Sequence, residues 1–225
     1  MNKYILWAVA GFIVLGSLYT VISGQSIKSS SEATKFTAVT NLPEGSYRVA
    51  LFAGGCFWSL ESYFEKAPEG ILNVVSGYSG GKSQNPTYEN YKYEGHREVV
   101  QVTYDPKKIS YGELVEYYFR HIDPTDAGGS FFDRGENYTS AIYYENEEEK
   151  KVAEDVIGVI EANDIFEKPI VTDVLPQSTF WPAEGYHQDY AANNSVRYTS
   201  YRIGSGRDAF LNMTWSGKER VLYKE

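Results

Sequence analysis

The stretch 47–66, YRVALFAGGCFWSLESYFEK, predicts the central turn of the fold. Its first part, Tyr47 to Ala53, is typical of a buried strand, and the part from Cys56 to about Lys66 is typical of a helix. Gly54 and Gly55 lie between them and allow the backbone to turn sharply. The sequence therefore predicts that Cys56 lies at the N-terminus of a helix.

Further strands and helices partly alternate along the rest of the chain. Further strands are expected at Ile71 to Tyr78, Glu98 to Tyr104, Tyr138 to Tyr144 and Ile170 to Leu175. Two helices are expected to begin after capping boxes, one at Ser110 and Glu113 and one at Asn146 and Glu149. Residues 123–137 are expected to form a loop, and the residues after Leu175 show no clear period. The pattern predicts an α+β fold with a mixed sheet and a long irregular C-terminal segment.

Cys56 is the only cysteine of the 225 residues. A helix N-terminus offers unpaired N–H groups and partial positive charge, which favour the thiolate and lower the pKa of a thiol. These properties make Cys56 a candidate nucleophile. The alternative is a buried structural cysteine, because free cysteine is often buried. An unpaired cysteine is also able to link two chains.

The N-terminal segment indicates export. No charged residue occurs from Tyr4 to Ile22, and a run of this length can cross a bilayer. We expect residues 1–24 to be an uncleaved anchor rather than a cleaved signal, with Lys3 on the cytoplasmic side and the remainder outside. Residues 25–45 are expected to form a flexible tether, and residues 46–225 the catalytic domain. If the segment is cleaved, the protein is secreted or periplasmic.

Composition excludes some functions. A hydrophobic content of 42% predicts a globular domain, and a net charge of −9 argues against binding of nucleic acid. The cysteine and the three histidines show no zinc-ligand spacing, and phosphate-loop and dinucleotide fingerprints are absent. We therefore expect no bound metal.

Three side chains besides Cys56 are candidates for the site. Glu98 shares a strand face with Val100, so its carboxyl group points toward the core, where burial raises a carboxyl pKa and keeps a proton available. The alternative is a glutamate that reaches solvent or pairs with a Lys or Arg. His96 or His187 beside Cys56 would make a Cys–His acyl-transfer enzyme, whereas His121 is expected to cap a helix.

Five motifs in one order carry a family resemblance. They are Gly55-Cys56-Phe57-Trp58, Gly77-Tyr78-Ser79-Gly80-Gly81, Pro86-Thr87-Tyr88, Gly95-His96-Arg97-Glu98-Val99-Val100, and Asp133-Arg134-Gly135 before Tyr138 and Ser140-Ala141-Ile142. Over about Tyr47 to Tyr190 the chain resembles the peptide methionine sulfoxide reductase A family. The resemblance implies a ferredoxin-like, two-layer α+β core. It also implies reduction of the S-epimer of methionine sulfoxide, free or in proteins, without a bound cofactor.

The resemblance also implies roles for individual residues. Cys56 matches the nucleophile and Glu98 the acid. Phe57 and Trp58 match the apolar wall that receives the substrate methyl group, and Tyr88, Asp133 and Tyr138 match positions that line the pocket. A sulfoxide oxygen leaves only once it is protonated, so attack by a thiolate needs a neutral acid and hydroxyl donors nearby. The attack leaves Cys56 as a sulfenic acid.

The chain lacks the second, resolving cysteine that many family members carry near the C-terminus. An external thiol must then reduce the sulfenic acid, and outside the cytoplasm we expect a thioredoxin-like protein. We expect a monomer that acts on oxidised proteins or peptides. Two further alternatives remain open at this point, a module that binds oxidised methionine without turnover and a protein that uses Cys56 only to dimerise.

Overall fold

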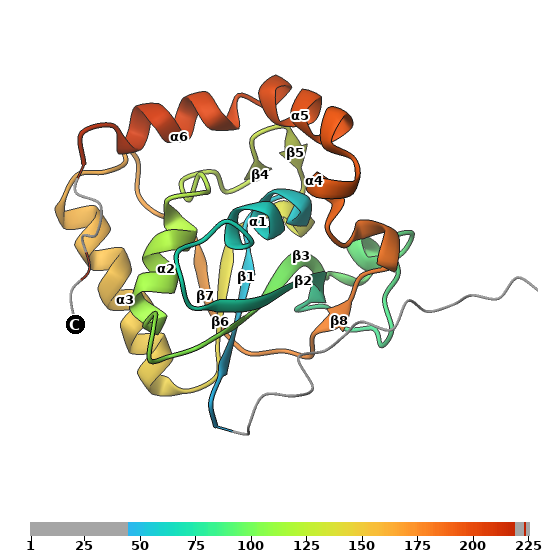
Figure 1. Cartoon of the computed structure of the whole chain (residues 1–225), viewed down its shortest axis with the longest axis horizontal. Helices are drawn as coiled ribbons and strands as arrows, with labels where there is room; N and C mark the ends of the chain where they lie inside the picture. Colours follow the sequence, from blue (N-terminus) through green and yellow to red (C-terminus); the bar gives the residue numbers. More distant parts are fainter. Residues whose placement is uncertain (1–44, 219–222, 224–225) are drawn as a thin grey trace, which may run out of the picture. The chain divides into compact units, whose positions relative to one another are not determined.

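The structure is a computed structural model that describes residues 45–218 and 223, and it has the α+β architecture with a mixed sheet that the sequence predicts (Figure 1). The sheet consists of β1 (Arg48–Ala53), β2 (Ile71–Ser79), β3 (Arg97–Tyr104), β6 (Ala141–Tyr144), β7 (Asp173–Pro176) and β8 (Trp181–Pro182). Its strand order is β7-β6-β1-β3-β2-β8. Only β6 and β7 pair in parallel among these described strands, and the other neighbours are antiparallel.

Helices α1 (Phe57–Phe64), α2 (Tyr111–Phe119) and α3 (Glu147–Ala162) supply the second layer. One core joins their apolar residues to the inward face of β1 and β3, where Phe52, Val100 and Val102 are fully buried. Leu51 and Val99 point to the opposite face and pack with Tyr143 of β6. The period of two in β1 and β3 therefore fixes which side chains face the helices.

The two predicted helix starts differ in their capping. The Ser110 Oγ accepts from the Glu113 N–H at 3.2 Å and the Glu113 carboxylate accepts from the Ser110 N–H at 2.8 Å, which completes a capping box for α2. At α3, Asn146 accepts from the Glu149 N–H at 2.9 Å, but the Glu149 carboxylate accepts from the Glu145 N–H instead. The second capping box is therefore one-sided, because Glu149 reaches one residue further back along the chain.

Several predicted boundaries shift in the structure. Strand β6 starts at Ala141, because residues 136–138 form the 3-10 helix η2 (Glu136–Tyr138). The expected loop before it contains a short hairpin, β4 (Gly129–Ser130) and β5 (Asp133–Arg134). Another 3-10 helix, η1 (Tyr91–Glu94), precedes β3. Strand β7 starts only at Asp173, three residues later than expected.

The expectation of an irregular C-terminal segment is wrong. The segment contains η3 (Gly185–His187), α4 (Tyr190–Asn193), α5 (Ser195–Gly204) and α6 (Arg207–Trp215), which follow one another across one end of the domain (Figure 1). These helices bury few side chains, with Tyr198 the buried residue of α5, so the sequence shows no apolar stripe.

Gln188 attaches the start of this segment to the sheet. Its side-chain amide accepts from the Ser76 N–H at 2.9 Å and donates to the Ser76 carbonyl at 2.9 Å. The same amide donates to the Ala183 carbonyl at 3.0 Å. Gln188 thus satisfies β2 backbone groups as a neighbouring strand would, and it positions His187 and Tyr190 on either side of itself.

The predicted anchor at 1–24 and all but the last residue of the predicted tether at 25–45 lie outside the described residues. Over residues 45–218 and 223, no helix has the length and apolar content that crossing a bilayer requires.

Candidate active site

Cys56 lies where β1 ends and α1 begins, as predicted. It is the N-cap residue of α1, and its carbonyl oxygen accepts from the Ser59 N–H at 3.0 Å. Gly55 adopts a φ of +93°, in the region that favours glycine. The Cys56 side chain is 7% exposed, so a disulfide between two copies of the chain would require local opening.

The helix N-terminus acts on the thiol in the predicted direction, but the net pKa of Cys56 is raised and not lowered. Burial raises the pKa of the Cys56 thiol well above its ordinary value, and the nearby carboxyl groups of Glu98 and Asp133 raise it further. The Trp58 backbone N–H and the Arg207 guanidinium act in the opposite direction, but they are weaker. Desolvation of the sulfur therefore exceeds the effect of the helix end, and the unliganded protein holds a thiol.

Glu98 lies beside this turn and is 2% exposed. Its carboxyl group accepts from the Phe57 N–H at 2.9 Å and from the Tyr91 hydroxyl at 2.8 Å. Burial raises the pKa of Glu98 to about 8, although both of these hydrogen bonds lower it. At neutral pH, Glu98 is thus predominantly protonated and able to donate a proton next to Cys56.

Three tyrosines surround Glu98. Tyr91, on η1, was not singled out in the sequence, yet it makes the direct contact, and Asn137 donates to its hydroxyl at 3.0 Å. Burial and the Glu98 charge raise the pKa of the Tyr138 hydroxyl. Tyr88 is 41% exposed, and burial followed by the charges of Glu98 and Cys56 raises the pKa of its hydroxyl. The structure therefore brings the predicted Tyr88 and Tyr138 to the same carboxyl group.

Asp133, on β5, also lies beside Cys56. The Tyr201 hydroxyl donates to its carboxylate, and burial raises its pKa. The Tyr201 hydrogen bond, the Arg207 charge and the Cys56 backbone N–H all lower that pKa. Tyr201 and Arg207 belong to the C-terminal helices α5 and α6, so two segments far apart in sequence meet at this carboxylate.

The two predicted wall residues follow Cys56 on the first turn of α1. Phe57 is 1% exposed and packs against Tyr78 and His187, with ring centroids 5.8 and 5.0 Å away. Trp58 is half-buried and stacks on Tyr190, with ring centroids 3.6 Å apart. Both rings directly follow Cys56 in sequence and pack against other aromatic rings, and Trp58 is the more accessible of the two.

The three histidines serve other contacts in the described part of the chain, and none hydrogen-bonds to Cys56 there. The His187 Nδ1 accepts from the Trp58 indole at 3.1 Å. His96 holds the glycine turn, since its Nδ1 accepts from the Gly81 N–H at 3.2 Å. His121 bonds to the Tyr117 carbonyl near the end of α2, and burial lowers its pKa to about 4, so it makes this contact as a neutral ring.

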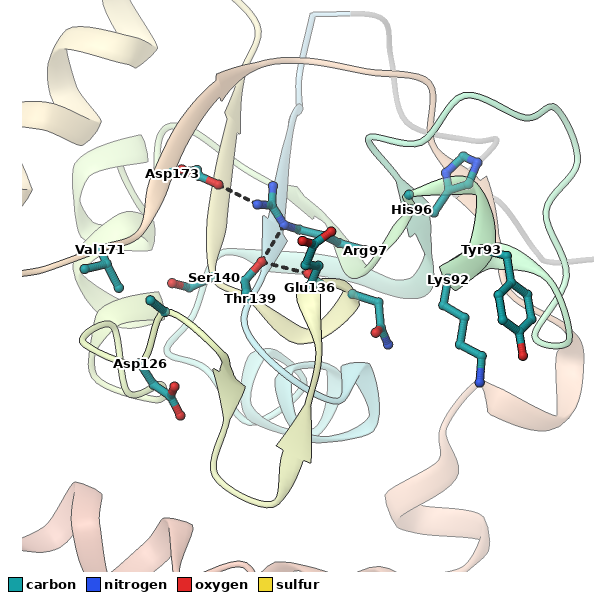
Figure 2. A pocket seen from close by; sticks show the side chains of 13 residues that line it. Lys92, Tyr93, His96, Arg97, Asp126, Glu136, Thr139, Ser140, Val171 and Asp173 are labelled. Carbon is teal, nitrogen blue, oxygen red and sulfur yellow. Dashed lines mark hydrogen bonds and ion pairs between the residues drawn. The ribbon is translucent and has the colours of Figure 1, made fainter.

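A separate polar cavity of about 720 Å³ is lined by His96 but by none of the other predicted site residues, and Figure 2 shows its lining side chains. Arg97 crosses it, donating to Thr139 at 2.8 Å and pairing with Asp173 at 2.5 Å. Asn137 lines this cavity and also contacts Tyr91, so it links the cavity to the site. Over residues 45–218 and 223, no group of His, Cys, Asp or Glu side chains is arranged to hold a metal ion.

The site combines a buried thiol with a protonated carboxyl group, and comparison with known proteins identifies its family. The family model described as peptide methionine sulfoxide reductase matches residues 48–219. Peptide methionine sulfoxide reductase MsrA of Bacillus licheniformis is 51% identical over 172 residues, which cover 76% of this chain and 94% of that protein. The chain therefore belongs to the peptide methionine sulfoxide reductase family.

Solved structures agree with this assignment. The reduced form of Mxr1 from Saccharomyces cerevisiae has a TM-score of 0.64 and 26% identity, covering 68% of this chain and 88% of that one. Methionine sulfoxide reductase A of Corynebacterium diphtheriae has a TM-score of 0.59 and 28% identity, covering 68% of this chain and 77% of that one.

Proposed function

We propose that this methionine sulfoxide reductase acts on the S-epimer, with Cys56 as the nucleophile and Glu98 as the proton donor. The observation that carries the proposal is the Glu98 carboxyl group, which is protonated at neutral pH and held by the Phe57 N–H one residue after Cys56. A protonated sulfoxide oxygen is a far better leaving group than the free oxide, so an acid in this position lowers the barrier to attack by sulfur.

The reaction converts a thiol and a sulfoxide into a sulfenic acid and a thioether. The Cys56 sulfur attacks the sulfoxide sulfur while Glu98 gives its proton to the sulfoxide oxygen. The oxygen then passes to Cys56 as a sulfenic acid, methionine departs, and the thiol proton of Cys56 restores Glu98. The sulfur of Cys56 loses the two electrons that the methionine sulfur gains.

Substrate contacts follow from the same geometry. Tyr88 and Tyr138 offer hydroxyl groups to the sulfoxide oxygen, and Asp133 lines the pocket beside Cys56. Phe57 and Trp58 provide the apolar surface for the methyl group of oxidised methionine, either free or in a protein.

The oxidised enzyme needs an external reductant. Cys56 is the only cysteine of the chain, so no second thiol can form an internal disulfide with it. We assign the recycling step to a thioredoxin-like protein, which attacks the sulfenic acid, releases water and forms a mixed disulfide that its second thiol resolves.

We assign the catalytic domain to the outside of the cytoplasm, held by the N-terminal segment. The uncharged run from Tyr4 to Ile22 and the preceding Lys3 support this placement. Protease added to intact cells should remove the domain when the protein is expressed in a bacterium. Full protection from the protease, in cells where an exported control is cleaved, would contradict the assignment.

The activity test uses the full-length protein, dithiothreitol and peptides that carry one epimer of methionine sulfoxide. We expect turnover of the S-epimer alone, and its loss in Cys56→Ser, because an alcohol is a much weaker nucleophile than a thiolate. Activity that survives in Cys56→Ser would rule out Cys56 as the nucleophile. Release of the leaving group from activated esters by the wild type would instead favour the acyl-transfer alternative.

A further inference from the structure

Arg207 is a buried cation that the proposed mechanism does not yet use. It is the first residue of α6 and is 0% exposed. Its Nη1 donates to the His121 carbonyl at 3.2 Å, and its guanidinium lies 4.4 Å from the centre of the Phe131 ring. Its Nε and Nη2 have no hydrogen-bond partner among the described residues. Buried charges are costly when they are unpaired, so a guanidinium with two unused donor nitrogens indicates a negative charge that it serves.

One of the unused donors of Arg207, the Nη2, lies at the turn that carries Cys56. A Cβ atom on Gly55 would lie 3.0 Å from the Arg207 Nη2 and 2.8 Å from the Ser130 Oγ. The Ser130 hydroxyl is also buried and has no partner among the described residues. Two side chains from different elements, β4 and α6, thus direct unsatisfied polar groups to the one residue that precedes Cys56.

Two groups near Arg207 are able to carry the negative charge that it stabilises. Asp133 on β5 is influenced by Arg207 and is already engaged by the Tyr201 hydroxyl. The other is Cys56 at the start of α1. Arg207 lowers the pKa of its thiol, whereas the carboxyl groups of Glu98 and Asp133 raise it. Of the two, only Cys56 gains a charge during the reaction, when its thiol becomes the attacking thiolate.

We propose that Arg207 and Ser130 form a polar cradle at the Gly55–Cys56 turn, which stabilises negative charge on the Cys56 sulfur as the thiol is activated. Arg207 does not contact the substrate in this proposal, and it acts on the reaction only through the charge of the Cys56 sulfur. The proposal rests on the assignment of Cys56 as the nucleophile, and it places part of the thiol activation in the C-terminal helix α6.

The test measures the charge on the thiol directly. The rate at which iodoacetamide alkylates Cys56, followed against pH, reports the fraction of thiolate and is independent of sulfoxide reduction. Arg207→Met removes the cation and keeps an unbranched, apolar side chain. We expect its alkylation profile to move to higher pH and its turnover to fall about tenfold, whereas Arg207→Lys should recover part of both losses.

Arg202→Met is the matched control, because Arg202 is a cation of the neighbouring helix α5 that pairs with Asp208 instead. We expect its alkylation profile to match the wild type. A structural role for Arg207 would lower thermal stability and leave the alkylation profile of the folded protein unchanged, and that result in Arg207→Met would overturn the proposal.

Ser130→Ala keeps the test decisive if Arg207→Met does not fold. It removes one hydroxyl group from the cradle with little change in volume, and we expect a smaller shift of the alkylation profile in the same direction. If Arg207→Met is unfolded, a wild-type profile in Ser130→Ala would overturn the cradle. Activity that persists in Cys56→Ser would instead remove the proposed function while leaving these alkylation results interpretable.

Discussion

The carboxyl groups of Glu98 and Asp133 both lie near Cys56, but only Asp133 has a cation close to it. Glu98 receives hydrogen bonds from uncharged donors, the Phe57 N–H and the Tyr91 hydroxyl, and burial raises its pKa to about 8. Asp133 also has a raised pKa, but it faces the Arg207 cation in addition to the Tyr201 hydroxyl. Burial raises the pKa of both carboxyl groups, but only at Asp133 does a nearby cation act against that rise.

The comparison predicts unequal effects when each carboxyl group becomes an amide. Glu98→Gln should lower kcat on an S-sulfoxide peptide by about 10²-fold or more, because the amide cannot supply the proton. Asp133→Asn should lower it less, because that carboxylate is not the donor. Equal losses in steady-state kinetics, with both variants folded by circular dichroism, would contradict the division of roles.

The pH profile of kcat tests the protonation of Glu98. Its pKa of about 8 is above the ordinary carboxyl value, so the acid form is present at neutral pH and is lost as the pH rises through about 8. We expect turnover at saturating substrate to fall on this alkaline side. Asp133→Asn should move the fall to lower pH, because the Asp133 charge raises the pKa of Glu98. A fall that stays in place in Asp133→Asn would show that the two groups are not coupled.

Tyr91→Phe tests whether the tyrosine hydroxyl controls the pKa of Glu98. The Tyr91 hydroxyl donates to the carboxyl group and lowers its pKa, so the variant should shift the alkaline fall to higher pH and reduce kcat about tenfold. Tyr93→Phe is the control, because Tyr93 lies on the same turn and is 76% exposed. The interpretation fails if both variants show the same pH profile.

A third buried carboxyl group, Glu61 of α1, is expected to affect the pH dependence of stability rather than the reaction. Burial raises its pKa to about 8. The folded protein then binds more protons than the unfolded chain between the ordinary carboxyl pKa and about 8, so stability falls as the pH rises across this window. Glu61→Gln should reduce the slope by up to about 1.4 kcal/mol per pH unit, as measured by urea unfolding at several pH values. An unchanged slope would mean that Glu61 is not buried as a neutral acid.

The parts of the fold that follow a hydrophobic period could be predicted from the sequence. The period of two correctly placed Glu98 on the buried face of β3, and the capping box correctly placed the start of α2. Helices α4 to α6 were missed because few of their side chains are buried, so they show no apolar stripe at helical spacing.

The site was predictable where a motif is local and unpredictable where contacts are distant. Tyr91 was missed, since its role depends on a 3-10 turn that positions its hydroxyl group beside Glu98. Arg207 was missed because arginine is seldom fully buried, and the one local signal was the glycine before it, which adopts a φ of +72°.

The position of α6 also has a consequence for synthesis of the protein. Cys56 precedes the first helix of the described domain, and Arg207 begins the last. Because translation runs from the N-terminus, the nascent chain carries the nucleophile long before its cation and the Tyr190 ring that covers Trp58 have been made. A ribosome-bound chain that ends before α6 therefore carries Cys56 without the Arg207 cation.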